Sequence, residues 1–167
     1  GGEGLSGTGP KAGGPLYLLR LLAHCPQNAA LRSVQASGAA ALPQPPLALQ
    51  ALHDWAVTQG RLPLAHACAQ FAAASPAGLQ ATLRGPTGER NVYTLAPRAH
   101  VLCVATSVSD LLVQTAAVLA SGGKALWPTA QASLRNQLPA AAQAQVVLQD
   151  NALTEASVAL DAVLHHG

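Results

Sequence analysis

The sequence predicts an α/β chain with a Rossmann-like, doubly wound parallel sheet, preceded by a β-hairpin and two N-terminal helices. Three observations predict this fold. Apolar residues recur at helical spacing over residues 46–75, the apolar period then changes to two over 79–95, and short apolar runs alternate with helical segments from residue 101. Strands that alternate with helices in this order are typical of a parallel sheet with right-handed crossovers.

The composition excludes several classes of protein. The 167 residues suffice for one α/β domain or for one domain with the end of another, and 36 Ala, 27 Leu and few aromatic residues indicate a core of small side chains. Charged residues make up 10% and no run of Lys or Arg occurs, so we expect no nucleic-acid surface. Apolar runs are too short to cross a bilayer. Cys25, Cys68 and Cys103 indicate reduced thiols in a cytoplasmic protein.

The first 15 residues are rich in glycine and contain two prolines, which predicts a shaped loop. Residues 7–12 satisfy G-x-G-x-x-A, but more glycine and proline follow where a dinucleotide loop would open a helix, so a loop packed on another domain is the better interpretation. Consecutive N–H groups at Gly13 and Gly14 would suit a carboxylate. Residues 16–22 fit either a strand or a helical turn, and residues 26–43 are interpreted as a linker.

The segment after the linker predicts two helices and a hairpin. Residues 46–59 start at a proline and end before Gly60, which favours a helix. A second helix carries Pro63 in its first turn, has Leu64, Cys68, Phe71 and Ala72 on its apolar stripe, and ends at Ser75-Pro76. Alternating residues over 79–83 and 92–95, with a Gly-Pro-Thr-Gly turn between them, predict the β-hairpin.

From residue 101 the pattern predicts βαβαβα. Residues 101–105 indicate a strand buried on both faces, and Ser107 with Asp110 forms a capping box for a helix that ends at Gly122-Gly123. A strand over 124–127, a short helix over 130–138 and a strand over 145–148 follow. We expect a last helix, capped by Asn151, that carries Leu153, Ala156, Leu160, Val163 and Leu164, and a sheet completed by residues beyond 167.

The residues offer little that could catalyse a reaction. The six histidines lack metal-ligand spacing, no G-x-S-x-G occurs, and Cys103 lies within a buried strand, so we predict no catalytic, cofactor-binding or metal-binding residues. A doubly wound sheet binds ligands at the loop after its first strand, which here contains Ser107 and Ser109 but no glycine. The alternative to a catalytically inert segment is an independent nucleotide-binding or regulatory module that uses this crevice.

Two stretches carry a resemblance to a known family. The opening GGEGLSGTGPKAGGPLYLLRLL resembles the end of the aldehyde dehydrogenase domain in the bifunctional proline utilization proteins of bacteria, which oxidise proline to glutamate. The stretch from Gly85 through Trp127-Pro128 resembles the extra C-terminal domain of the long members of this family. In relatives that oxidise glutamate semialdehyde, the loop that matches Gly13 and Gly14 holds the substrate carboxylate, so the resemblance implies that role here.

The second stretch departs from a working aldehyde dehydrogenase at two places. Ser107-Val108-Ser109-Asp110 stands where the family has Pro-Trp-Asn-Phe-Pro, whose Asn helps to hold the oxyanion. Trp127-Pro128-Thr129-Ala130-Gln131 stands where the family has Lys-Pro-x-Glu, whose Lys contacts the cofactor ribose. The resemblance therefore implies a non-catalytic copy of the nucleotide-binding fold, which covers the substrate tunnel of the neighbouring enzyme.

The resemblance also implies a domain plan and partners. Residues 1–25 would form the end of the catalytic domain, and residues 44–167 would form the aldehyde dehydrogenase-like domain, incomplete at its C-terminus. Residues 26–43 would be the linker between these two domains. The segment would bind no cofactor itself, whereas the parent enzyme would use NAD and FAD and would take glutamate semialdehyde as a substrate. Its partners would be the upstream catalytic domains of the same chain, within a homo-oligomer. Any membrane association or DNA binding of the parent would use regions absent here.

Overall fold

The computed structural model describes residues 17–26, 29, 32, 44–83, 87–88, 90–155 and 160–166. The chain divides into two compact units. The first comprises Gly1–Pro43 with Gly78–Ala96, and the second comprises Gln44–Ala77 with Pro97–Gly167.

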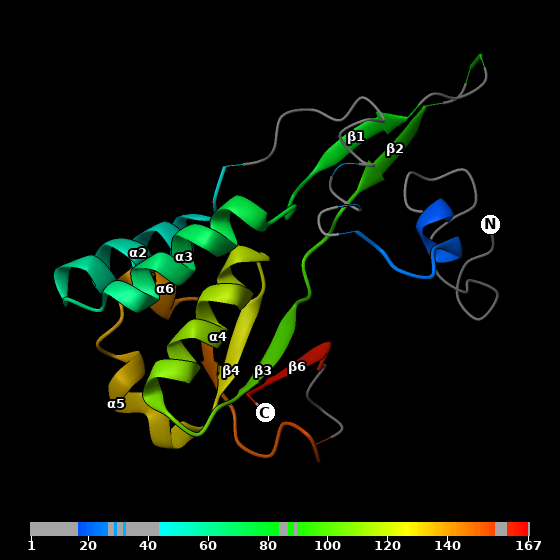
Figure 1. Ribbon diagram of the computed structural model, residues 1–167. Helices are drawn as coiled ribbons and strands as arrows, with labels where there is room; N and C mark the ends of the chain where they lie inside the picture. Colours follow the sequence, from blue (N-terminus) through cyan, green and yellow to red (C-terminus); the bar gives the residue numbers. More distant parts are fainter. Residues whose placement is uncertain are drawn as a thin grey trace. The chain divides into compact units, whose positions relative to one another are not determined.

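The first unit contains the predicted hairpin. Strands β1 (Gln80–Leu83) and β2 (Asn91–Thr94) pair antiparallel with Gln80 opposite Thr94 (Figure 1). Leu79 and Ala81 are buried, and Tyr93 and Leu95 pack against them. The alternating pattern is thus confirmed as a hairpin with one apolar face.

The apolar run after the glycine-rich opening forms a short 3₁₀ helix, η2 (Tyr17–Leu21), which settles the choice left open by the sequence. Leu18 and Leu21 are 70% and 74% exposed, and Leu22, which follows the helix, is also exposed. The described residues therefore do not bury these leucines.

The two predicted helices of the second unit are confirmed as α2 (Leu47–Thr58) and α3 (Leu62–Ala74). Pro46 directly precedes α2, and a proline lies in the first turn of α3, where its missing N–H costs nothing. Gly60 adopts φ +68° between the helices, a left-handed conformation that favours glycine. Each helix buries one stripe, namely Ala48, Leu49, Leu52 and Ala56 of α2 and Leu64, Ala65 and Cys68 of α3.

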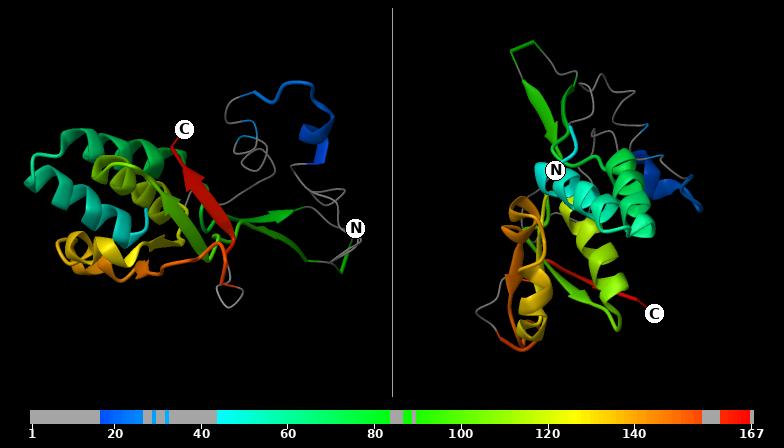
Figure 2. Two further views of the ribbon diagram at one scale, coloured as in Figure 1. Left: turned by 90° about the horizontal axis from the view of Figure 1, so that it is seen from below. Right: turned by 90° about the vertical axis from the view of Figure 1, so that its left-hand side faces the viewer.

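A four-stranded parallel sheet forms the centre of the second unit, which confirms the Rossmann-like α/β fold. The strands are β3 (His100–Val104), β4 (Lys124–Trp127), β5 (Val146–Leu148) and β6 (Ala162–His165), in the spatial order β5-β4-β3-β6 (Figures 1 and 2). All three pairings are parallel. The order reverses at β3, because its sequence neighbour β4 lies on one side and β6 lies on the other.

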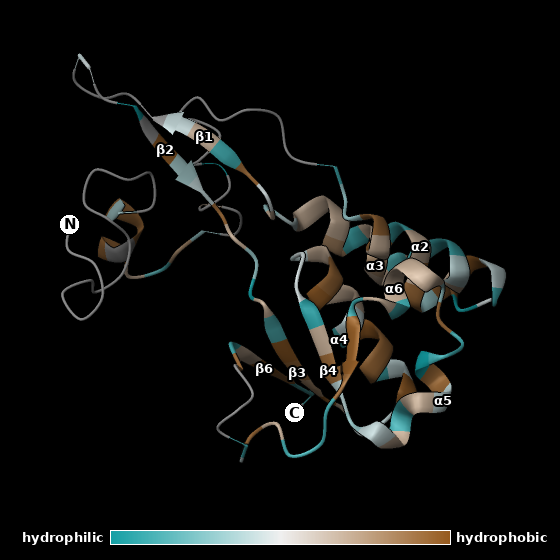
Figure 3. Cartoon of the chain, turned by 180° about the vertical axis from the view of Figure 1, so that it is seen from behind, coloured by the Kyte–Doolittle hydropathy of each residue, from teal (hydrophilic) through white to brown (hydrophobic). Residues whose placement is uncertain are grey.

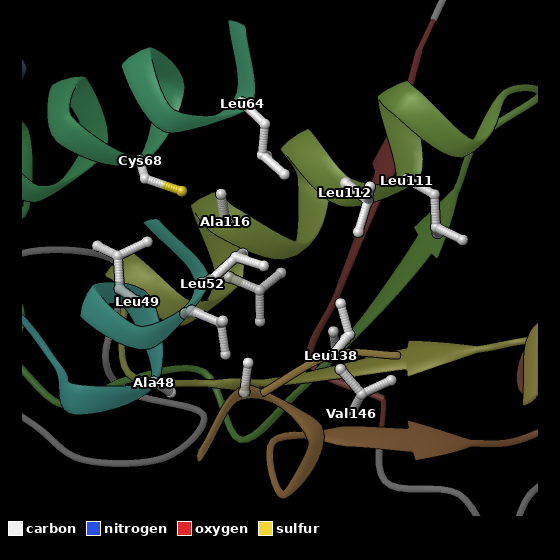
Figure 4. Close-up of a cluster of buried hydrophobic side chains, with 14 of the residues drawn as sticks. Ala48, Leu49, Leu52, Leu64, Cys68, Leu111, Leu112, Ala116, Leu138 and Val146 are labelled. Carbon is white, nitrogen blue, oxygen red and sulfur yellow. The ribbon is translucent and has the colours of Figure 1, made fainter. Parts of the chain in front are cut away.

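Helices cover one face of this sheet. Helix α4 (Val108–Ala120) connects β3 to β4, while η3 (Thr129–Gln131), α5 (Ala132–Arg135) and α6 (Ala140–Gln143) connect β4 to β5. Aliphatic side chains of α2, α3 and α4 interdigitate above Val146 and Leu138 (Figure 4). Many of these side chains are small, as the composition predicted. Because small side chains fill little space, a closely packed core requires these helices to lie close to the sheet and to one another.

The expected last helix is wrong. Residues 162–165 form β6, which pairs with β3 in the register Val101 with Ala162 through Val104 with His165. Ala162 and Leu164 face the helix-covered core, whereas Val163 and His165 are exposed. This two-residue alternation is the period of a strand. The sequence pattern predicted a helix because Val163 and Leu164 lie three and four residues after Leu160, which is also the spacing of a helix face.

The other face of the sheet is covered differently. Leu102 and Leu126 are buried there beneath Ala152 and the partly buried Leu160. The described residues of the connection from β5 to β6 contain no helix. No helix in the described part of the chain is long and apolar enough to cross a membrane.

Candidate functional site

The carboxyl ends of β3 and β6 mark the point where the strand order reverses. Parallel α/β sheets bind their ligands in the crevice at such a point. The connection from β3 to α4 passes over this edge, and residue 166 follows directly after β6. This edge is therefore the candidate site. It is also where the sequence predicted a ligand crevice beside Ser107 and Ser109.

Ser107 is the N-cap of α4, as predicted. Its Oγ accepts a hydrogen bond from the Asp110 N–H at 3.1 Å and donates one to Asp110 Oδ2 at 2.7 Å. A helix N-terminus attracts anions because its N–H groups and its dipole point outward. Here the Asp110 carboxylate already lies in the first turn, so a negative charge and an occupied hydroxyl disfavour a phosphate. Ser109 is exposed.

Gln114 of α4 lies beneath this helix end and is 4% exposed. Its Nε2 donates to the carbonyl oxygen of Val104 at 2.9 Å and contacts His166 Nδ1 at 2.7 Å. His166 Nε2 lies 3.8 Å from Asp110 Oδ1. Gln114 and His166 thus join α4 to the end of β6, and sequence reasoning missed both because 52 residues separate them.

The edge after β4 carries a second polar pair. Asp150 accepts hydrogen bonds from the Thr129 hydroxyl and from the Thr129 N–H, the latter at 2.9 Å. These hydrogen bonds, the hydroxyl first, hold the pKa of Asp150 below its usual value, so the carboxylate stays charged. Thr129 lies two residues after β4, close to where the aldehyde dehydrogenase pattern has its cofactor lysine.

Apart from His165 and His166 at the end of β6, the polar side chains described along this edge are acidic or neutral. Residues 105–107, 128–131 and 149–155, which follow β3, β4 and β5, contain no lysine, arginine or glycine. A shallow cavity of about 300 Å³ opens there, lined mainly by residues 149–154 with Leu102 and Pro128. Lysine, arginine and close-approaching glycine backbone are the groups that hold a pyrophosphate, and these loops supply none of them.

The described residues contain no group of three His, Cys, Asp or Glu side chains that could hold a metal ion. Burial raises the pKa of the Cys68 thiol to about 11 and that of Cys103 to about 12. A thiol with such a pKa is almost entirely protonated near neutral pH and is a poor nucleophile. Cys25 is exposed. The predicted carboxylate-binding pair, Gly13 and Gly14, lies outside the described residues.

These features define a Rossmann-like α/β domain whose described loops after β3, β4 and β5 lack the phosphate-binding groups of a dinucleotide site. The chain is similar along its whole length to proteins named "Bifunctional protein PutA". It is 47% identical to that of Escherichia coli over 178 residues and 50% identical to that of Salmonella typhimurium over 175 residues, with 100% of this chain covered in both. The PutA protein of Rhizobium meliloti is 41% identical over 81% of the chain. No protein-family profile matches it.

The chain is homologous to a segment of PutA proteins, which confirms the resemblance predicted from the sequence. It spans 13% of the length of the Escherichia coli and Salmonella relatives. The similarity covers both the glycine-rich opening and the Rossmann-like unit.

Proposed function

We propose that this chain is the C-terminal segment of a bifunctional enzyme that combines proline dehydrogenase with NAD-dependent glutamate semialdehyde dehydrogenase. The observation that carries the proposal is the 46–50% identity to three PutA proteins over the whole chain. The parent would be a cytoplasmic homo-oligomer that holds NAD and FAD in domains upstream of this segment. Residues 1–25 would complete the aldehyde dehydrogenase domain, and residues 44–167 would form a lid over the substrate tunnel. Residues 26–43 would be the linker between them.

The exposed leucines of η2 support the proposal that the first residues complete a larger domain. Leu18, Leu21 and Leu22 lie within five residues, and η2 is strongly apolar (Figure 3). Three exposed leucines this close together in the chain favour an interface over scattered surface positions. In the proposed parent, the upstream catalytic domain would cover these leucines.

The Rossmann-like unit would act as a non-catalytic lid over the substrate tunnel. Its carboxyl edge lacks the Asn and Lys that a working aldehyde dehydrogenase has at the matching positions, and Asp110 places a negative charge at the N-terminus of α4. Its buried thiols are protonated near neutral pH. The unit would therefore contribute by covering the neighbouring active site.

The proposed anchor at Gly13 and Gly14 is tested in the intact enzyme by the double variant Gly13→Ala/Gly14→Ala. A Cβ at each position would keep the substrate carboxylate from approaching the two N–H groups. We expect KM for glutamate semialdehyde to rise roughly tenfold to a hundredfold, the factor for one lost charge-assisted hydrogen bond. A simple aldehyde without a carboxylate should be oxidised as before. Equal losses with both substrates would overturn the anchor role, and Gly7→Ala is the matched control in the same loop.

The lid is tested by deleting residues 44–167 from the intact enzyme, which removes the Rossmann-like unit together with the hairpin of the first unit. We expect proline oxidation at the upstream site to continue, while more of the intermediate escapes to bulk solvent before the aldehyde is oxidised. The amount of intermediate caught by an added amine trap, relative to the NADH formed, measures the escape. If this ratio did not change, the unit would not be a lid, although the family assignment would stand.

The alternative, an independent nucleotide-binding or regulatory module, has the strand reversal in its favour but not the polar groups around it. It requires that Ser107 and Ser109 bind an anion, whereas the Ser107 hydroxyl already bonds Asp110 at 2.7 Å. We expect calorimetric titration with millimolar NAD to give no saturable heat. Saturable binding that Ser107→Leu abolishes would favour the module instead.

A further inference from the structure

The orientation of the Gln114 amide is fixed by its surroundings. Its Nε2 lies 2.9 Å from the carbonyl oxygen of Val104, and a carbonyl oxygen can only accept. The group that faces it must therefore be the NH₂ end. The same NH₂ lies 2.7 Å from His166 Nδ1, so this ring nitrogen must be the acceptor. A neutral imidazole protonated at Nε2 is the only form of His166 that satisfies this contact.

The geometry points to a pH-sensitive latch: we propose that neutral His166 fastens the end of β6 to α4 through Gln114, and that protonation of His166 at Nδ1 releases it. The proton comes from solvent, because the His166 side chain is 40% exposed. Once Nδ1 carries a proton, an N–H faces an N–H at hydrogen-bond distance. The Gln114 contact is then lost, and the buried NH₂ keeps a single partner in Val104.

Helix α4 places two polar side chains next to the His166 ring. They are Gln114, whose Nε2 lies 2.7 Å from Nδ1, and Asp110, whose Oδ1 lies 3.8 Å from Nε2. Strand β3 contributes the Val104 carbonyl, which accepts a hydrogen bond from Gln114. Asp110 is the only charged side chain in the described part of the chain within ion-pair distance of this ring.

The Gln114 contact is shorter and better shielded from solvent than the Asp110 contact. Gln114 is 4% exposed, so losing His166 leaves its NH₂ group with the Val104 carbonyl as its protein partner, and loss of a hydrogen bond to a buried donor is costly. The Asp110 side chain is 38% exposed and shares its carboxylate with Ser107, so solvent screens its attraction for imidazolium. Acid therefore weakens the connection between β6 and α4, and it loosens the edge of the sheet where the strand order reverses.

Hydrogen exchange of the intact protein, followed by mass spectrometry on peptides covering residues 160–166, tests the latch. Rates are divided by those of the unfolded protein at each pH, which removes the intrinsic pH dependence. Between pH 8 and pH 5, the range in which histidine ordinarily changes charge, we expect protection to fall roughly fivefold, as for the loss of one hydrogen bond. Equal protection at both pH values, or greater protection at pH 5, would overturn the proposal.

Three variants separate the latch from general acid sensitivity. His166→Asn places an amide oxygen near the position of Nδ1, accepts from Gln114 at every pH, and should make protection independent of pH. Gln114→Leu should lower protection of β6 already at pH 8 while the circular dichroism of the protein is retained. His165→Gln, which changes the exposed neighbour, should behave as wild type. A pH dependence that persists in His166→Asn would assign the effect to another group.

Discussion

The indole Nε1 of Trp127 donates a hydrogen bond to Thr115 Oγ1 at 2.9 Å, which joins β4 to α4 inside the core. Both side chains are fully buried, and the Thr115 hydroxyl in turn donates to the carbonyl oxygen of Leu111 at 2.7 Å. The largest side chain of the core is therefore held by a hydroxyl that serves as donor and acceptor at once. This arrangement places the indole in a core built mainly from Ala, Leu and Val, together with the buried Cys68 and Cys103.

Replacing Thr115 with valine should destabilise the second unit. Valine has nearly the same shape as threonine, but the Trp127 N–H loses its acceptor in a position that water does not reach. We expect the free energy of unfolding to fall by about 1–3 kcal/mol. Urea unfolding followed by tryptophan fluorescence measures the loss. Thr115→Ser keeps the hydroxyl and serves as the control for hydrogen bonding. Equal stability of the valine variant and wild type would mean that the indole N–H finds another partner.

Gly123 lies at the turn between α4 and β4, and the main chain approaches it closely. A Cβ built there would lie 2.4 Å from the carbonyl oxygen of Arg98, a contact that only backbone movement can relieve. We expect Gly123→Ala to lower the free energy of unfolding by about 1–3 kcal/mol. Gln59→Ala, at an exposed position, is the surface control. A thermal midpoint of Gly123→Ala equal to that of wild type would show that the turn adjusts freely.

Local sequence signals predicted most of the fold. Pro46 and Ser107 mark helix starts through backbone chemistry that depends only on neighbouring residues, and α2 and α4 begin directly after them. Strand β6 escaped prediction because its stability comes from pairing with β3, about 60 residues away. The spacing of Leu160, Val163 and Leu164 fits a helix locally, and only the tertiary pairing decides against it.

The sequence predicted the location of the candidate site but not the side-chain contacts within it. The sequence located it after β3 because doubly wound sheets bind ligands there. The sequence could not show that the Ser107 hydroxyl is hydrogen-bonded to Asp110, nor that His166 contacts Gln114. Both facts depend on side-chain geometry, and the second also depends on β6, which the sequence pattern concealed. Gly13 and Gly14 stay a prediction.

The three cysteines should differ widely in reactivity. Burial raises the pKa of Cys68 to about 11 and that of Cys103 to about 12, so at pH 8 their thiolate forms are scarce and also shielded from reagents. Cys25 is exposed among the described residues. We expect iodoacetamide at pH 8 to modify Cys25 in the native chain, and all three cysteines only in denaturant. Peptide mapping reads the outcome, and prompt native labelling of Cys103 would contradict its buried position in β3.

Asp161 fastens the start of β3 to the residues that precede β6, and this contact should depend on pH. Its Oδ2 accepts hydrogen bonds from the N–H groups of His100 at 3.0 Å and of Ala99 at 2.6 Å. These bonds, that of His100 first, lower the pKa of the Asp161 carboxyl below its ordinary value. A carboxyl whose pKa is lower in the folded than in the unfolded chain adds stability above the unfolded pKa, near 3.9.

That stability is lost as the pH falls through the lower, folded pKa, because the protonated carboxyl no longer accepts the two bonds as a charged group. Asp161→Asn should therefore be less stable than wild type at pH 7, and the difference should shrink as the pH is lowered below about 4. Urea midpoints of the two proteins, measured side by side from pH 7 to pH 3, provide the test. A difference that stays constant over this range would show that the carboxylate charge contributes nothing, and that Asp161 acts through its shape alone.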